Sequence, residues 1–163
     1  MTPITLKLAE RLIELRWMLS SAESCTGGMI ASRCTDLPGS SAWFDRGFVT
    51  YSNHAKSQML GVPEPLIASC GAVSEPVAKA MALGAVYRSL SRVSIAVTGV
   101  AGPGGGSTEK PVGTVWLAWC IDGRVDTECQ HFSDNREQIR HATAQYALEG
   151  LFKRLPAVQP LDV

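Results

Sequence analysis

The sequence predicts an α/β protein, a three-layer α/β/α sandwich with a mixed sheet. Strand patterns alternate with helical patterns through the first two-thirds of the chain, which is typical of parallel strands joined by crossover helices. Two later strand patterns flank a tight-turn signal and precede a final helix, which adds an antiparallel hairpin. The 163 residues, 45% of them hydrophobic, are expected to form one domain over residues 1–163.

The first elements follow from apolar spacing and capping residues. A helix is expected at the start of the chain, with Thr2 as its cap and Pro3 as its first residue. Its apolar stripe is formed by Ile4, Leu8, Leu12 and Leu15. A strand over residues 17–22 follows, and a polar turn over 23–28 joins it to a helical stretch over 30–34.

The next part of the chain is predicted to hold a strand and a short helix. Residues 47–51 have the β-branched and aromatic character of a strand. Ser52 or Asn53 then caps a short helix, and Pro63 and Pro65 are expected to interrupt the chain after it.

The strongest strand signal lies in the second half of the sequence. A helix with a face of small residues opens at Ser74 and precedes a β-branched run over 93–98, which we place at the sheet centre. Strands over 113–120 and 124–132 flank Asp122-Gly123, a pair that favours a tight hairpin turn with positive φ.

The last predicted element is an amphipathic helix. Asp134 and Glu137 stand at the spacing of a capping box, so Asp134 is the expected cap. Apolar residues continue at helical spacing to Leu155, and Pro156 ends the helix.

The composition argues against several classes of protein. Fifteen Lys and Arg residues balance fifteen Asp and Glu residues, so no global field favours nucleic acid or an anionic membrane. No apolar stretch approaches the roughly 20 residues that span a bilayer, and the first residues lack the apolar core of a signal peptide. We therefore expect a soluble cytoplasmic protein that binds neither nucleic acid nor membrane.

The cysteines and histidines predict neither disulfides nor a metal site. Five cysteines without a C-x-x-C pair fit a reducing compartment: Cys25, Cys34, Cys70, Cys120 and Cys129. The three histidines share no short ligand spacing: His54, His131 and His141. Neither a metal nor a cofactor is therefore expected.

Two segments are candidates for binding an anionic ligand. Residues 99–113 form a long glycine-rich connection whose N–H groups could approach an anion, although a plain flexible loop explains them equally well. Residues 24–28 lie where a strand meets a helix, so hydroxyl and N–H groups converge there, unless Ser24 or Thr26 merely caps the helix. Thr98 ends the presumed central strand, where ligand crevices of α/β sheets lie.

The residues alone leave the nucleophile of a hydrolase open. Ser40 or Ser41, with Tyr51 and Lys56 downstream, form one candidate set that spacing cannot select. Each member has an ordinary alternative, as a helix cap, a solvated lysine or an exposed tyrosine. Cys25 is a second candidate nucleophile, but no histidine lies near it in the sequence.

Four motifs, in this order along the chain, resemble the CinA C-terminal domain family. They are AESCTGG (22–28), PGSSAWFDRGFVTYSNHAKSQMLGV (38–62), GAVSEPVA (71–78) and VTGVAGPGGGSTEKPVGTVW (97–116). The similarity extends from about Leu6 to Leu155, and the chain resembles the stand-alone form of the domain. The match is weaker at residues 133–136, where a Gly-Asp-Arg type of turn is expected.

The resemblance implies an activity and a set of site residues. Members of the family act as nicotinamide-nucleotide amidases, which convert nicotinamide mononucleotide (NMN) and water to nicotinate mononucleotide and ammonia in pyridine nucleotide salvage. The matching motifs imply Ser41 as a nucleophile that forms an acyl-enzyme, Lys56 as its base and Tyr51 as a supporting hydroxyl. The expected substrate contacts, with two arginines as alternatives for the phosphate, are Ser24, Thr26, Gly27, Thr98, Gly99, Gly102, Arg136 and Arg140. By analogy, a homodimer is expected.

This chemistry makes a demand on Lys56 that burial could meet. A lysine accepts a serine proton only when neutral, and lowering its pKa from about 10.4 to about 7.4 requires roughly 4 kcal/mol from burial or nearby positive charge. The pyridinium of the substrate could supply part of this. The alternative function is a non-catalytic nucleotide-binding module linked to competence or DNA damage.

Overall fold

The computed structural model describes residues 3–158, none of whose helices is long and apolar enough to cross a membrane. The helices and strands are α1 (Ile4–Leu15), β1 (Leu19–Glu23), α2 (Met29–Thr35), the 3₁₀ turn η1 (Ser40–Ala42), β2 (Phe44–Val49), α3 (Asn53–Leu60), α4 (Glu64–Cys70), α5 (Glu75–Tyr87), β3 (Val93–Gly99), β4 (Thr114–Ile121), β5 (Arg124–His131) and α6 (Arg136–Arg154).

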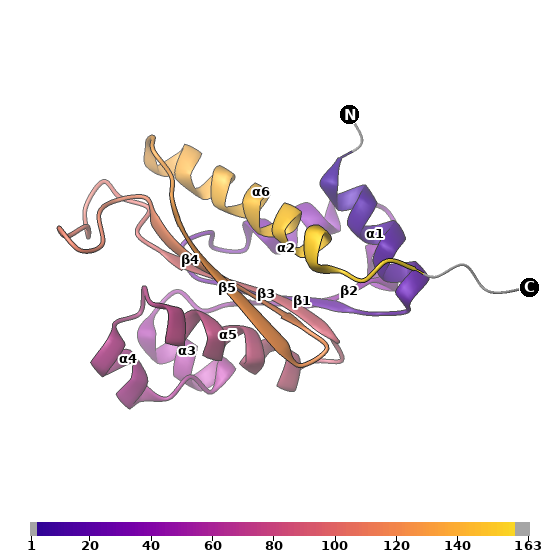
Figure 1. Ribbon diagram of the computed structural model, residues 1–163, viewed down its shortest axis with the longest axis horizontal. Coiled ribbons are helices and arrows are strands. Elements are labelled where there is room, and N and C mark those ends of the chain that lie inside the picture. Colours follow the sequence, from indigo (N-terminus) through magenta and orange to yellow (C-terminus); the bar gives the residue numbers. More distant parts are fainter. Residues whose placement is uncertain (1–2, 159–163) are drawn as a thin grey trace, which may run out of the picture.

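The five strands form one mixed sheet in the order β2-β1-β3-β4-β5. Strand β1 pairs in parallel with β2 and β3, and β4 pairs antiparallel with β3 and β5. Helices α1, α2 and α6 cover one face of the sheet, and α3, α4 and α5 cover the other (Figure 1). The predicted three-layer α/β/α sandwich is confirmed, with the 93–98 strand at its centre.

Each face of the sheet has its own core. Under α1 and α6 the core contains Trp119, whose indole N–H donates to the carbonyl oxygen of Ala147 at 2.8 Å. Under α5 it contains Met81, and a Cβ at Gly84 would collide with the carbonyl of Leu60 on α3. The small-residue face of α5 therefore serves the close packing of helices within this chain.

The predicted hairpin turn and the predicted cap of the short helix are confirmed. The hairpin turns at Asp122 (φ 50°) and Gly123 (φ 85°), and the hydroxyl of Ser52 accepts the N–H of Ala55 to cap α3. The predicted cap of the last helix is wrong, because Asn135 and not Asp134 accepts the N–H of Gln138 at 3.0 Å.

Several boundaries differ from the prediction. The first strand is shifted to Leu19–Glu23, and the second ends at Val49, so Thr50 and Tyr51 belong to the connection that follows it. Pro3 is the N-cap of α1 and not its first residue, and Thr2 lies outside the described residues.

The sequence prediction missed a helix, α4. Pro63 is its N-cap and Pro65 lies in its first turn. A proline is tolerated there because the first N–H groups of a helix have no partner within it. The prolines that were expected to interrupt the chain therefore begin a helix.

Candidate active site

Three neighbouring strands bring polar residues to one edge of the sheet. Glu23, the last residue of β1, pairs with Val49 of β2 and with Val97 of β3. The next residues along these strands, Ser24, Thr50 and Thr98, therefore lie beside one another. This is the edge at which open α/β sheets bind ligands.

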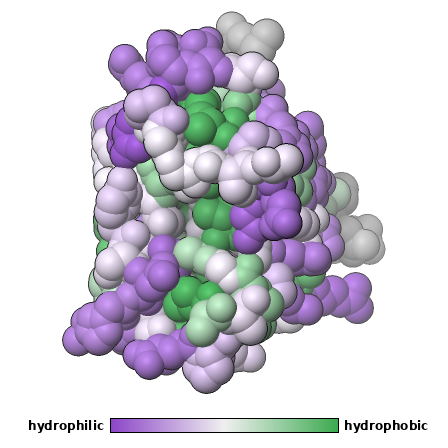
Figure 2. Space-filling view, turned by 90° about the vertical axis from the view of Figure 1, so that its left-hand side faces the viewer, coloured by the Kyte–Doolittle hydropathy of each residue, from purple (hydrophilic) through white to green (hydrophobic). Residues whose placement is uncertain are grey.

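A cavity of about 270 Å³ opens at this edge, at the left-hand end of Figure 1. It is lined by Ser24, Cys25, Tyr51, Asn53, Lys56, Ala72, Val73, Thr98, Gly99, Ala101 and Arg136. Figure 2 looks at this end of the molecule, where apolar residues gather in the middle of the face and hydrophilic residues border them. The cavity itself combines polar side chains, such as Ser24, Lys56 and Arg136, with the small apolar residues Ala72, Val73 and Ala101.

A buried polar contact in the cavity joins Lys56 and Ser24. Lys56 is the fourth residue of α3, and its side chain is only 1% exposed. Its Nζ donates to Ser24 Oγ at 3.0 Å and to the carbonyl oxygen of Thr50 at 3.0 Å. Ser24 itself is 8% exposed, so the pair is held in a nearly closed environment.

Burial shifts the protonation equilibrium of Lys56 toward the neutral amine. Loss of hydration lowers the pKa of its ammonium group below the ordinary value of 10.5. A salt bridge to a carboxylate would oppose this lowering of the pKa, but among residues 3–158 no carboxylate forms one with Lys56. A neutral amine beside a serine hydroxyl can take its proton, which is what an attacking serine requires.

Tyr51 and Arg136 meet at the mouth of the cavity. The Arg136 guanidinium donates to the Tyr51 hydroxyl at 2.9 Å and to the carbonyl oxygen of Gly102 at 2.9 Å. Both side chains are exposed, and neither of these acceptors is a carboxylate. The positive charge of Arg136 therefore lies at the mouth of the cavity and is not neutralised by either of these partners.

Arg140 and Thr26 have a different task, the shaping of the turn after Ser24. Arg140 donates to the carbonyl oxygens of Cys25 and Thr26, each at 3.0 Å. The buried Thr26 hydroxyl donates to Glu23, and Gly27 supplies a positive φ of 59°. These three residues lie outside the cavity lining, so the structure does not bring them together with the expected substrate contacts.

The end of α2 that the sequence suggested as an anion site is already occupied. The carboxylate of Glu23 accepts the N–H groups of Ile30 at 2.8 Å and Ala31 at 3.0 Å. A substrate phosphate cannot use the same donors. Sequence reasoning missed Glu23 because it ended the strand at Ala22.

The glycine-rich connection contributes its beginning to the site. Thr98 and Gly99 line the cavity, and the Thr98 hydroxyl donates to the carbonyl oxygen of Ala72 at 2.9 Å. Gly102 lies outside the lining, and its carbonyl holds Arg136. Asn53, which carried no sequence signal for a site, and Ala101, in the candidate segment 99–113, also line the cavity.

Ser41 is not brought together with Lys56 and Tyr51 in the single chain. It is an exposed residue of η1, before the start of β2, whereas Tyr51 follows the end of that strand. Six residues of β2 at about 3.3 Å each separate the two ends by about 20 Å. Within one chain the Ser41–Lys56 pair that the resemblance implies is therefore not formed, because a strand places the residues before and after it at opposite edges of a sheet.

Cys25 lines the cavity, but its thiol is unsuited to nucleophilic attack. Burial, the largest cause, raises its pKa to about 11, so the thiolate is rare near neutral pH. We expect Cys25→Ala to retain activity within about threefold of the original chain, because the thiol is not ionised. Steady-state ammonia release measures this, and a loss of more than 100-fold in folded protein would restore the thiol as the nucleophile.

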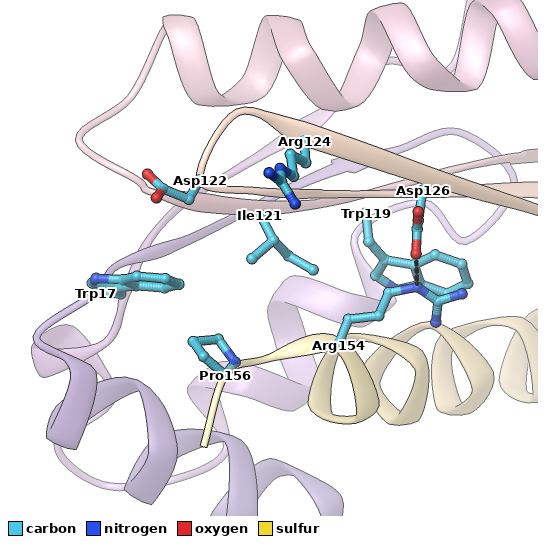
Figure 3. A pocket seen from close by; sticks show the side chains of 8 residues that line it. All are labelled: Trp17, Trp119, Ile121, Asp122, Arg124, Asp126, Arg154 and Pro156. Carbon is cyan, nitrogen blue, oxygen red and sulfur yellow. Dashed lines mark hydrogen bonds and ion pairs between the residues drawn. The ribbon is translucent and has the colours of Figure 1, made fainter. Parts of the chain in front are cut away.

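A larger cavity, of about 620 Å³, lies at the opposite edge of the sheet (Figure 3). It is lined by Trp17, Trp119, Ile121, Asp122, Arg124, Asp126, Arg154 and Pro156. Arg154 lies against the ring of Trp119 and pairs with Asp126 at 3.1 Å. This lining offers no hydroxyl or thiol nucleophile, so the smaller cavity is the candidate active site.

Comparison with known proteins gives a consistent result. Residues 1–155 match the CinA C-terminal domain. "Nicotinamide-nucleotide amidohydrolase PncC" of Pseudomonas putida is 51% identical over 93% of this chain and 95% of its own, and the protein of that name from Escherichia coli K12 is 50% identical over 83% of each. The crystal structure of the competence/damage inducible protein CihA from Agrobacterium tumefaciens superposes with a TM-score of 0.86, at 49% identity over 93% of this chain and 96% of that one. The chain belongs to the CinA C-terminal domain family.

Proposed function

We propose that this protein hydrolyses the carboxamide of NMN to give nicotinate mononucleotide and ammonia. The observation that supports this most is the 3.0 Å contact between a buried lysine and Ser24 in a cavity that also holds Arg136. The names of relatives about half identical to this chain supply the substrate. On this geometry we propose Ser24 as the nucleophile, in place of the Ser41 that the family resemblance implies.

In the proposed first step Ser24 is acylated. Neutral Lys56 takes the hydroxyl proton as Ser24 Oγ bonds to the amide carbon, and the carbonyl oxygen becomes an oxyanion. Backbone N–H groups of the turn after Ser24 are the donors that we assign to this oxyanion. When the tetrahedral species collapses, the C–N bond breaks, and Lys56 returns the proton to the leaving nitrogen as ammonia forms.

In the second step water hydrolyses the ester. Lys56, neutral again, takes a proton from water as the hydroxide bonds to the acyl carbon. The ester C–O bond breaks, and Lys56 returns the proton to Ser24 Oγ. The carboxylic acid that forms loses its own proton to solvent, so nicotinate mononucleotide leaves as a carboxylate. Tyr51, within hydrogen-bond distance of Arg136, is proposed to orient groups at the mouth of the cavity and to support this proton movement.

Arg136 is the residue that we propose for the phosphate of the substrate. It lies at the cavity mouth with only neutral acceptors, whereas Arg140 uses its donors on the backbone of the turn. A guanidinium binds a phosphate through two parallel hydrogen bonds. These contacts favour Arg136 over Arg140 as the partner of the phosphate.

Arg136→Met is expected to raise KM for NMN by about 10- to 100-fold, because one charged hydrogen-bond partner is worth about 1.5–3 kcal/mol. Cleavage of nicotinamide riboside, which lacks the phosphate, should change less than about threefold. Ammonia release with both substrates measures the difference. Arg124→Met, in the distant cavity, is the matched control. Equal effects on both substrates would remove Arg136 from phosphate binding.

The function is tested by measuring ammonia release from NMN beside nicotinamide and nicotinamide riboside. We expect turnover of NMN to exceed that of the two substrates without phosphate. Calorimetric binding of NMN without ammonia production over hours would contradict the proposal. That result would favour the alternative of a non-catalytic nucleotide-binding module.

A further inference from the structure

Glu23 is a buried carboxylate with an unusual set of partners. It is the last residue of β1 and is 0% exposed. One oxygen accepts the Thr26 hydroxyl at 2.7 Å and the Ile30 N–H at 2.8 Å, and the other accepts the Ala31 N–H at 3.0 Å and the Ser21 hydroxyl at 3.3 Å. A buried carboxylate costs several kcal/mol unless hydrogen bonds compensate it, and here all four partners are donors.

These bonds tie the turn after Ser24 to the start of α2. The turn contains Gly27 and Gly28, both with positive φ (59° and 98°). It is therefore not part of a regular helix, whose own hydrogen bonds would fix it. The Glu23 carboxylate supplies fixed acceptors on one side of this turn.

The backbone of Glu23 also reaches the base. Its carbonyl oxygen accepts the N–H of Thr50 at 2.8 Å, and the Thr50 carbonyl accepts Lys56 Nζ at 3.0 Å. Successive strand residues point to opposite faces of a sheet, so the Glu23 side chain faces α2 while Ser24 faces Lys56. The Glu23 carboxylate therefore holds the turn that carries Ser24, and its backbone carbonyl holds the segment that accepts Lys56, without contact to either reacting group.

We propose that Glu23 is a positioning residue, which fixes the Ser24 hydroxyl against Lys56 through the backbone. This inference rests on the proposed function, because it takes Ser24 as the nucleophile. A displacement of about 1 Å in a reacting group can cost about 100-fold in rate, so the rigidity of this turn sets the rate of acylation. Both oxygens of Glu23 face only donors, and an amide in its place would set an NH₂ group against one of them.

The test is Glu23→Gln, with two measurements on protein shown to be folded by near-UV circular dichroism. We expect kcat for NMN to fall about 10- to 100-fold while KM changes less than about threefold. The rate of covalent labelling of Ser24 by diisopropyl fluorophosphate, followed by mass spectrometry, should fall in parallel. The pH midpoint of kcat/KM should stay unchanged, because burial and not Glu23 shifts the pKa of Lys56.

Two further variants keep the test decisive. Thr26→Val removes one donor and leaves the carboxylate, so we expect a loss of about 3- to 10-fold in both rates. Glu128→Gln removes a carboxylate that is also hydrogen bonded, to Tyr146 and Arg154, but remote from the turn. It should lower the melting temperature without changing kcat or labelling.

The outcomes separate this inference from the proposed function. Two outcomes overturn the positioning role. One is a folded Glu23→Gln variant with the original kcat and labelling rate, and the other is loss of the fold in both Glu23→Gln and Thr26→Val. An original chain that is labelled at Ser24 but does not hydrolyse NMN overturns the proposed substrate, and labelling then decides the role of Glu23. A chain that is neither labelled nor active overturns both.

Discussion

Ser24→Ala is expected to lower kcat for NMN by about 10³-fold or more, because no acyl-enzyme forms without the hydroxyl. The substitution removes one oxygen atom from a nearly buried position, so the fold should persist. Ammonia release measures kcat, and mass spectrometry should find the acyl adduct and the fluorophosphate label on Ser24 of the original chain only.

Ser41→Ala tests whether the nucleophile is Ser24, as the geometry favours, or Ser41, as the family resemblance implies. An exposed serine at the far edge of the sheet should leave turnover within about twofold. Loss of activity in this variant, with full activity in Ser24→Ala, would contradict our assignment. It would instead indicate that a second chain supplies Ser41 in a homodimer, in which case mixing Ser41→Ala with Lys56→Met, each inactive alone, would restore ammonia release.

Lys56→Met is expected to lower kcat as much as Ser24→Ala does. The protein should stay folded and be at least as stable as the original chain near neutral pH. Methionine has a similar length and no charge, so it removes the cost of burying an ammonium group. Activity is lost because no base takes the serine proton. Ammonia release and thermal unfolding of both proteins measure the two effects.

The stability of the folded chain is expected to depend on pH through Lys56. The pKa of Lys56 is lowered in the folded chain, so between that pKa and 10.5 the unfolded chain binds more protons than the folded one. The stability contributed by this group therefore rises with pH through that window and becomes level above it. The kcat/KM of the original chain should rise as Lys56 loses its proton. Lys56→Met should lack the rise in stability, and an unchanged pH profile of stability would show that Lys56 is not the titrating group.

The sequence predicted Lys56, Tyr51, Thr98 and Arg136 at one site, and the structure places all four around one cavity. The family motifs implied Lys56, Tyr51 and Arg136, which spacing alone could not select, whereas Thr98 was also marked by the end of a β-branched run. Thr26, Gly27 and Gly102 were expected to touch substrate as well, and in the structure they lie outside the cavity lining and shape the backbone around the site. Motif matching identifies residues that a site needs without showing whether they bind a ligand or shape the chain.

The sequence by itself determined the α/β class, the central strand, the hairpin and the family, because hydrophobic period, turn residues and motifs are local properties of the chain. Only the tertiary structure decided which serine meets Lys56. Ser24 and Lys56 are 32 positions apart, yet parallel pairing of β1 and β2 brings their ends together. Ser41 is nearer to Lys56 in the sequence, but β2 lies between them, so Ser41 is at the other edge of the sheet. Proton transfer depends on distance in space.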